Sequence, residues 1–108
     1  MPNLYTRERG AGKPLLFIHG FPMHQGVWSD FGNRFVNTYK VITIDLPGFG
    51  KSSILPSPFS LDQVADQLIQ YLVGQEIINS AVIGHSLGGY VALEMIKQRP
   101  DLFSAIGL

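Results

Sequence analysis

The sequence of 108 residues contains no cysteine, which excludes disulfide bonds, thiolate nucleophiles and zinc–thiolate sites. It also has no net charge, because eight Lys and Arg residues balance eight Asp and Glu residues. Such a chain offers no electrostatic attraction to nucleic acid or to an anionic membrane surface, so neither is expected as a partner.

Long apolar runs are also missing. None approaches the roughly 20 residues of a membrane span, and the N-terminal segment MPNLYTRERG lacks the apolar region of a signal peptide. Together with the lack of cysteine, this pattern predicts a cytoplasmic protein.

What the sequence does contain is a regular alternation of strand and helix signals. Hydrophobic residues make up 45% of the chain, enough for the core of one domain. Short apolar runs predict strands at 14–20, 40–48, 80–84 and 104–108. Helical periodicity predicts helices at 28–36, 61–72 and 87–98. This order predicts an α/β fold with a mostly parallel sheet and helices on both faces.

Local signals fix the ends of the middle helix. Ser60 and Gln63 match a capping box, in which each side chain satisfies a backbone N–H at the helix start. Gly74 is predicted to end this helix. In the preceding helix, Trp28, Phe31 and Phe35 recur at helical spacing, which favours a core position over a ligand-binding aromatic box.

The segment GHSLGG, Gly84 to Gly89, presents a serine in the setting that a nucleophile needs. Gly84 and Gly88 frame Ser86 in the pattern G-x-S-x-G, between a predicted strand and a predicted helix. A sharp turn there lifts the hydroxyl clear of the backbone, and the helix start offers free N–H groups to an oxyanion. The alternative is a turn of small residues that only starts a helix.

Two further motifs precede the serine: HGFP at His19–Pro22 and DLPGFGKS at Asp45–Ser52. With GHSLGG, they make the chain resemble the N-terminal part of an α/β-hydrolase-fold serine hydrolase. The resemblance covers nearly all of residues 1–108, which are then one part of a single domain. It implies a partial α/β-hydrolase fold, truncated after the helix that follows the nucleophile turn.

The resemblance also implies roles for individual residues. Ser86 is the expected nucleophile, and the backbone N–H groups of Phe21 and Leu87 are the expected oxyanion hole. The residues expected to shape the turn and the loop are His19, Gly20, Gly84 and Gly88. A serine at the nucleophile position favours acyl transfer from a small carboxylic ester through an acyl-enzyme. No metal or organic cofactor is implied, and the isomer of the Phe21–Pro22 bond stays open.

A serine nucleophile needs a histidine base and an acid, which in this fold follow the serine in the chain. Residues 87–108 contain only Glu94 and Asp101 as acids and no histidine. His24 and His85 are weak candidates for the base. We therefore expect the triad acid and histidine to be absent from this chain, which alone has little or no hydrolase activity.

Two other functions stay open. The chain could be a non-catalytic binding module, or two copies could form a homodimer through the unfinished sheet edge at 104–108. Nucleotide binding is disfavoured, because the phosphate-loop pattern requires glycine where Asp45 stands. The segment from Asp45 to Ser52 is instead expected to form a structural turn.

Overall fold

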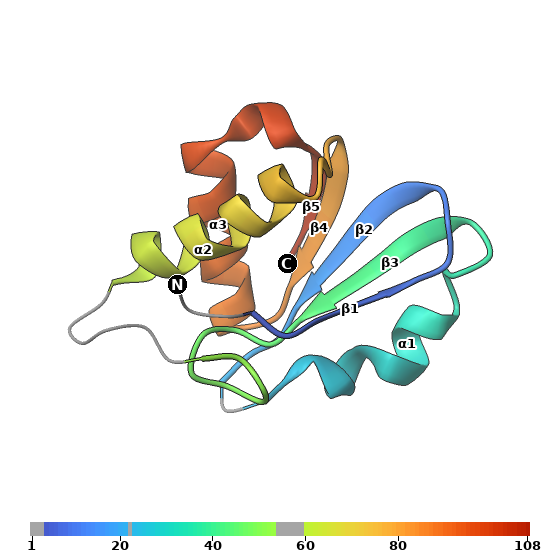
Figure 1. Ribbon diagram of the computed structural model, residues 1–108, viewed down its shortest axis with the longest axis horizontal. Coiled ribbons are helices and arrows are strands. Elements are labelled where there is room, and N and C mark those ends of the chain that lie inside the picture. Colours follow the sequence, from blue (N-terminus) through green and yellow to red (C-terminus); the bar gives the residue numbers. More distant parts are fainter. Residues whose placement is uncertain (1–3, 22, 54–59) are drawn as a thin grey trace.

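The computed structural model describes residues 4–21, 23–53 and 60–108 and contains a five-stranded sheet with helices on both faces (Figure 1). The strands are β1 (Thr6–Arg9), β2 (Lys13–Ile18), β3 (Tyr39–Ile44), β4 (Ser80–Gly84) and β5 (Phe103–Gly107). The helices are α1 (Ser29–Asn33), α2 (Leu61–Gly74) and α3 (Leu87–Gln98), with short 3₁₀ helices at Gln25–Trp28 and Pro100–Leu102.

The strand order is β1-β3-β2-β4-β5. Strands β2 to β5 are parallel, and β1 runs antiparallel to β3. The chain leaves β2 toward β3 on one side and later crosses back to β4 on the other side of β2. The strand order therefore reverses between β2 and β4, and open α/β sheets bind ligands at the carboxyl ends of such strands.

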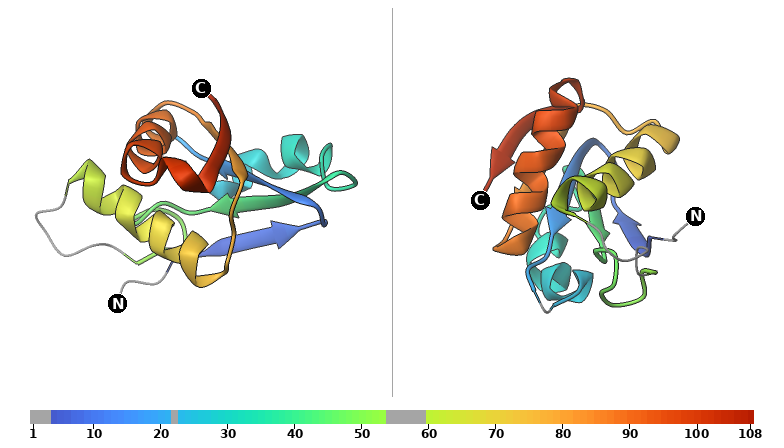
Figure 2. Two further views of the ribbon diagram at one scale, coloured as in Figure 1. Left: turned by 90° about the horizontal axis from the view of Figure 1, so that it is seen from above. Right: turned by 90° about the vertical axis from the view of Figure 1, so that its left-hand side faces the viewer.

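Each sheet face carries its own apolar core, as the alternation of side chains along β2 shows. Leu16 and Ile18 pack with the buried residues of α2 and α3. Leu15 and Phe17 point the other way, toward Trp28 and the chain around α1. Figure 2 shows α2 and α3 side by side, and α1 lies across the sheet from them. The predicted parallel sheet covered on both faces is confirmed.

The helix predicted at 28–36 is wrong in its extent. The structure has a 3₁₀ helix at Gln25–Trp28, five α-helical residues at Ser29–Asn33, and turns up to Thr38. Gly32 and the following asparagine are poor helix formers, which limits its length. The aromatic face is nevertheless core: the Phe17 ring centroid lies 4.9 Å from that of Trp28 and 6.2 Å from that of Phe35.

The predicted capping box at the start of α2 is confirmed, and Gln63 Oε1 accepts the Ser60 backbone N–H at 2.8 Å. The helix ends at Gly74 as predicted, although Gly74 is itself helical and does not supply the left-handed cap. The left-handed residue is Glu76, with φ of 56°. The Ile77 N–H donates to the Leu72 carbonyl at 2.9 Å and closes a Schellman turn.

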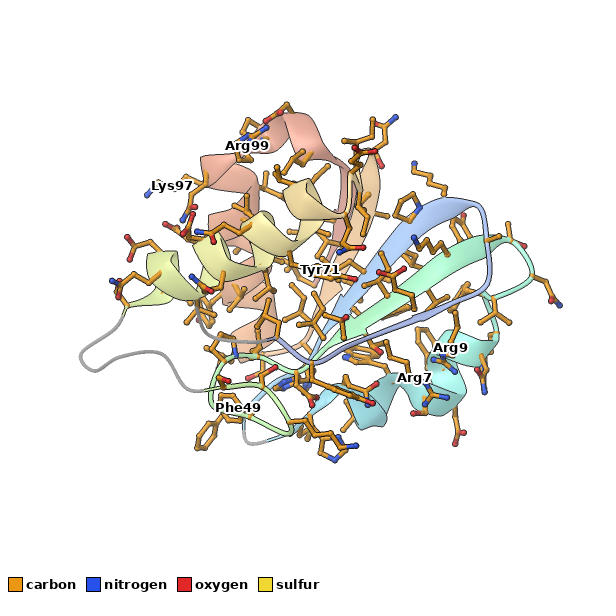
Figure 3. The ribbon with its side chains drawn as sticks, in the orientation of Figure 1. Arg7, Arg9, Phe49, Tyr71, Lys97 and Arg99 are labelled. Atoms are coloured by element: carbon orange, nitrogen blue, oxygen red, sulfur yellow. The ribbon has the colours of Figure 1, made fainter. Side chains whose placement is uncertain are left out.

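Strand β1 was not predicted, because its sequence TRER contains no apolar residue. Its side chains instead reach both helical layers (Figure 3). Arg9 donates hydrogen bonds to the Ser29 carbonyl and to the Asn33 side chain beside α1. On the opposite face Glu8 pairs with Lys40 at 2.9 Å and accepts a hydrogen bond from the Tyr71 hydroxyl of α2. Burial, and then the Glu8 bond, raise the pKa of Tyr71 to about 12.

Strand β5 forms one edge of the sheet and pairs only with β4 among the described strands. Ser104, Ala105 and Ile106 are exposed along it. Pairing of two copies through this edge stays a prediction. Within the described residues, no helix has the length and hydropathy needed to cross a membrane.

Candidate active site

Ser86 sits at the turn between β4 and α3 in a conformation that serine rarely adopts. Its φ of 55° and ψ of −117° place a residue with a Cβ in a region of the backbone map that favours glycine. Such strain costs on the order of 1–3 kcal/mol, and it persists where the surrounding structure holds it. Ser86 is exposed to solvent and lies just after the carboxyl end of β4. The predicted strand–turn–helix context of Ser86 is therefore present.

Two glycines permit the turn by letting backbone pack on backbone. A Cβ at Gly84 would lie 2.6 Å from the Gly88 carbonyl carbon and 2.7 Å from Gly89 Cα. A Cβ at Gly88 would lie 2.6 Å from the His19 carbonyl oxygen and nearer still to that of Ile18. Gly88 thus lets the first turn of α3 rest directly on the end of β2.

The HGFP loop lies against the serine turn. A Cβ at Gly20 would lie 3.0 Å from the His85 carbonyl oxygen and 3.1 Å from Ser86 Cβ. The Gly20 carbonyl accepts the Met23 N–H at 2.8 Å. Because a peptide plane directs its N–H opposite to its carbonyl, this bond turns the Phe21 N–H away from Met23. Pro22, and with it the isomer of the Phe21–Pro22 bond, lies outside the described residues.

At the start of α3, the N–H groups of Gly88, Gly89 and Tyr90 donate to the carbonyls of His85 and Ser86. In the described part of the chain, the Leu87 N–H meets no protein acceptor. A free N–H at the positive end of a 12-residue helix is suited to an anion.

His19 is fully buried and ties the loop to the segment after β3. Its Nε2 accepts the Leu46 N–H at 2.9 Å, so Nδ1 carries the proton and donates to the Gly20 carbonyl at 2.9 Å. The bond accepted by Nε2 requires a neutral ring, because a protonated Nε2 cannot accept the Leu46 N–H. Burial lowers the pKa of His19 below 6.5, against smaller opposing effects of the Gly20 carbonyl and Asp45. These two bonds join the loop after β2 to the segment after β3.

This neutral histidine makes stability depend on pH. Below pH 6.5 the unfolded chain takes up a proton at His19 that the folded chain excludes, so stability falls as pH decreases. One such proton changes the free energy of unfolding by at most about 1.4 kcal/mol per pH unit. We expect the free energy of unfolding, measured with urea, to decrease between pH 7.5 and 5. The decrease should be smaller in His19→Asn. His85→Asn is the control, because His85 is exposed. An unchanged pH dependence of stability in His19→Asn contradicts the assignment.

Asp45 holds together two loops near the site and is itself buried. Its carboxylate accepts the Gln25 N–H at 2.7 Å and the Lys51 N–H at 2.8 Å. Gly48 and Gly50 have φ values of 86° and 52°, which allow the tight turn between them. The prediction of a structural turn at 45–52 is confirmed. Sequence patterns gave no sign that Asp45 also anchors the loop before α1.

The other ionisable candidates do not complete a triad. Within the described residues, no hydrogen bond joins Ser86 to any of the three histidines. His24 Nδ1 accepts the Gly26 N–H at 3.0 Å. Asp101 pairs with Arg99 through two hydrogen bonds of 2.8 and 3.0 Å, away from the turn. A hollow of about 280 Å³ opens beside Ser86, lined by Tyr90, Leu93 and Leu108 among others.

Comparison with known proteins identifies the family. Residues 13–108 match the family model described as alpha/beta hydrolase fold. The chain belongs to this family. The α/β-hydrolase chain is 32% identical over 106 residues to a pimeloyl-[acyl-carrier protein] methyl ester esterase of Chromobacterium violaceum, covering 98% of this chain and 40% of that protein. It is 33% identical over 95 residues to an (E)-2-((N-methylformamido)methylene)succinate hydrolase of Acinetobacter baylyi, covering 88% of this chain and 36% of that one.

A solved structure of a thermophilic esterase from Thermogutta terrifontis superposes with a TM-score of 0.92 at 28% identity. The match covers 97% of this α/β-hydrolase chain and 39% of that one. The described sheet and helices therefore correspond to part of the α/β-hydrolase fold, as predicted. The chain spans about 40% of the length of the first curated relative it matches.

Proposed function

We propose that this sequence is the nucleophile-bearing part of a serine hydrolase that cleaves small carboxylic esters through an acyl-enzyme. The observation that carries this proposal is the positive φ of Ser86 at an exposed turn between β4 and α3. A strained, exposed serine that lies against Gly20 at the point where strand order reverses is suited to attack a bound carbonyl.

In this proposal the Ser86 hydroxyl oxygen adds to the ester carbonyl while a base takes its proton. The N–H groups of Leu87 and Phe21 hold the negative oxygen that forms. The tetrahedral intermediate then expels the alcohol, which receives the proton, and leaves an acyl group on Ser86. Water hydrolyses this acyl-enzyme to a carboxylic acid and free serine.

The ester substrate is supported by the two relatives named above, which are a methyl ester esterase and a second hydrolase. The base and its acid are proposed to lie outside residues 1–108, because residues 87–108 contain no histidine. His19 is not a candidate, since both of its ring nitrogens are bonded to backbone.

Ester hydrolysis by two forms of the protein tests this proposal. We expect residues 1–108 alone to hydrolyse 4-nitrophenyl butanoate at the background rate. The protein isolated from its source cells is expected to hydrolyse it in the ordinary range of such enzymes, on the order of 1–10³ per second. Ordinary turnover by residues 1–108 that is lost in Ser86→Ala contradicts the absence of a base. No turnover by the isolated protein with any short-chain ester contradicts the hydrolase proposal itself.

A further inference from the structure

An apolar cavity of about 240 Å³ lies between the first turns of α2 and α3. It is bounded on a third side by the segment that follows β3. The side chains that form most of its wall come from these three elements: Leu46, Phe49, Leu61, Val64, Leu87 and Val91.

The apolar wall favours the binding of a hydrocarbon group. None of the described side chains that line the cavity is charged, and Ser60 supplies the one hydroxyl group among them. Leu46 and Val91 are 1% and 0% exposed and form the deep end, whereas Leu61 is 37% exposed and stands at the mouth. A charged group would lose its hydration here without gaining a partner, but an apolar group would gain burial.

The cavity adjoins both proposed oxyanion donors. Leu87 lines it, and the backbone N–H of the same residue is one of the two proposed oxyanion donors. Phe49 lines it too, and its ring meets that of Phe21 edge-on with centroids 5.6 Å apart. Figure 3 shows Phe49 in the loop beyond the end of β3. Leu87 and Phe49 therefore connect the cavity to the proposed oxyanion site, whereas Ser86 itself lines the separate hollow beside Tyr90.

We propose that this cavity binds an unbranched aliphatic chain of the ester. The proposal rests on the function proposed above and adds the class of substrate. The cavity exceeds the roughly 150 Å³ that accommodates a benzene ring, so it has room for about six carbon atoms. The chain can belong to the acyl group or to the alcohol, and the two are separated below by experiment.

Binding of hexan-1-ol to the full-length protein tests the cavity directly. Methyl NMR signals of Val64, Leu87 and Val91 are expected to shift saturably as the alcohol is added. Leu61→Trp fills the mouth at an exposed position, and losing the burial of about two methylene groups weakens binding about tenfold. Val73→Trp is the control, because Val73 is exposed on the same helix about 18 Å away. Shifts spread over all exposed apolar residues, or equal binding by both variants, overturn the proposal.

Two ester series then identify which part of the substrate enters. With the hydrolytically active protein, kcat/KM is compared for methyl esters of acetate to hexanoate and for acetate esters of methanol to hexan-1-ol. We expect kcat/KM to rise with the length of the aliphatic chain in one of the two series. In Leu61→Trp this rise should be lost. A rise in the methyl ester series assigns the cavity to the acyl group, and a rise in the acetate series to the alcohol. No dependence on length in either series contradicts a role in substrate binding.

Failure of this proposal is distinguishable from failure of the proposed function. Ser86→Ala removes the nucleophile but leaves the cavity wall intact, so hexan-1-ol is expected to bind it as it binds the unchanged protein. Binding without any esterase activity contradicts the hydrolase alone. Esterase activity that requires Ser86, with no binding at Val64 and Val91, contradicts the cavity alone.

Discussion

Gly88→Ala is expected to destabilise the protein by about 3 kcal/mol or more, which is exceptional for the addition of one methyl group. The added carbon would meet the carbonyl oxygens of Ile18 and His19, which are backbone atoms of β2 and its end. Neither can move as a side chain would, so α3 must shift away from the sheet. The shift would also displace the turn that holds Ser86.

Urea unfolding followed by the fluorescence of Trp28, the only tryptophan among residues 1–108, measures this loss. Gly74→Ala is the matched control, because a Cβ there has no neighbour within 4 Å. Since Gly74 is the last residue of α2, alanine should stabilise the helix by about 0.5–1 kcal/mol. Similar stability in both variants would show that α3 does not rest on β2 as closely as described.

Ser86→Ala is expected to lower kcat of the active hydrolase by about 10⁴- to 10⁶-fold, because the acyl-enzyme cannot form. The substitution keeps the Cβ and the backbone strain, so stability should stay within about 0.5 kcal/mol of the unchanged protein. Initial rates with 4-nitrophenyl butanoate, measured beside urea unfolding, give both quantities. A loss of less than about tenfold would exclude Ser86 as the nucleophile.

Ser86→Gly separates the strained backbone from the chemistry. Glycine adopts a positive φ without penalty, so this variant should be about 1–3 kcal/mol more stable than Ser86→Ala while equally inactive. Equal stability of the two variants would mean that residue 86 is not strained in solution.

The parallel strands and their helices could be predicted because burial leaves a strong pattern. Strand β4 and helix α3 have the bounds expected from SAVIG and from the apolar run up to Gln98. Strand β1 left no such pattern, since it is held by pairing with β3 and by polar contacts of Glu8 and Arg9. The aromatic residues around α1 predicted the correct face but a longer helix, because burial does not require continuous helix.

The candidate site also contains features that could be predicted from the sequence and features that could not. Ser86 and its glycines could be placed from sequence, because a strand–serine–helix turn needs small residues at fixed spacing. The bonds of Asp45 to Gln25 and of His19 to Leu46 join residues 20 or more positions apart, and no local pattern encodes them. The apolar cavity between α2 and α3 could not be predicted either, because its wall combines three separate elements.

The most direct test of the account is to map the adduct of a fluorophosphonate, which reacts with activated serine hydroxyls. The protein from its source cells is treated with the probe, digested and sequenced by mass spectrometry. We predict one adduct, on Ser86 in the peptide containing GHSLGG, formed at a rate that falls to background in residues 1–108 alone. Esterase activity that is blocked by an adduct on any other residue would contradict the assignment of Ser86 as the nucleophile.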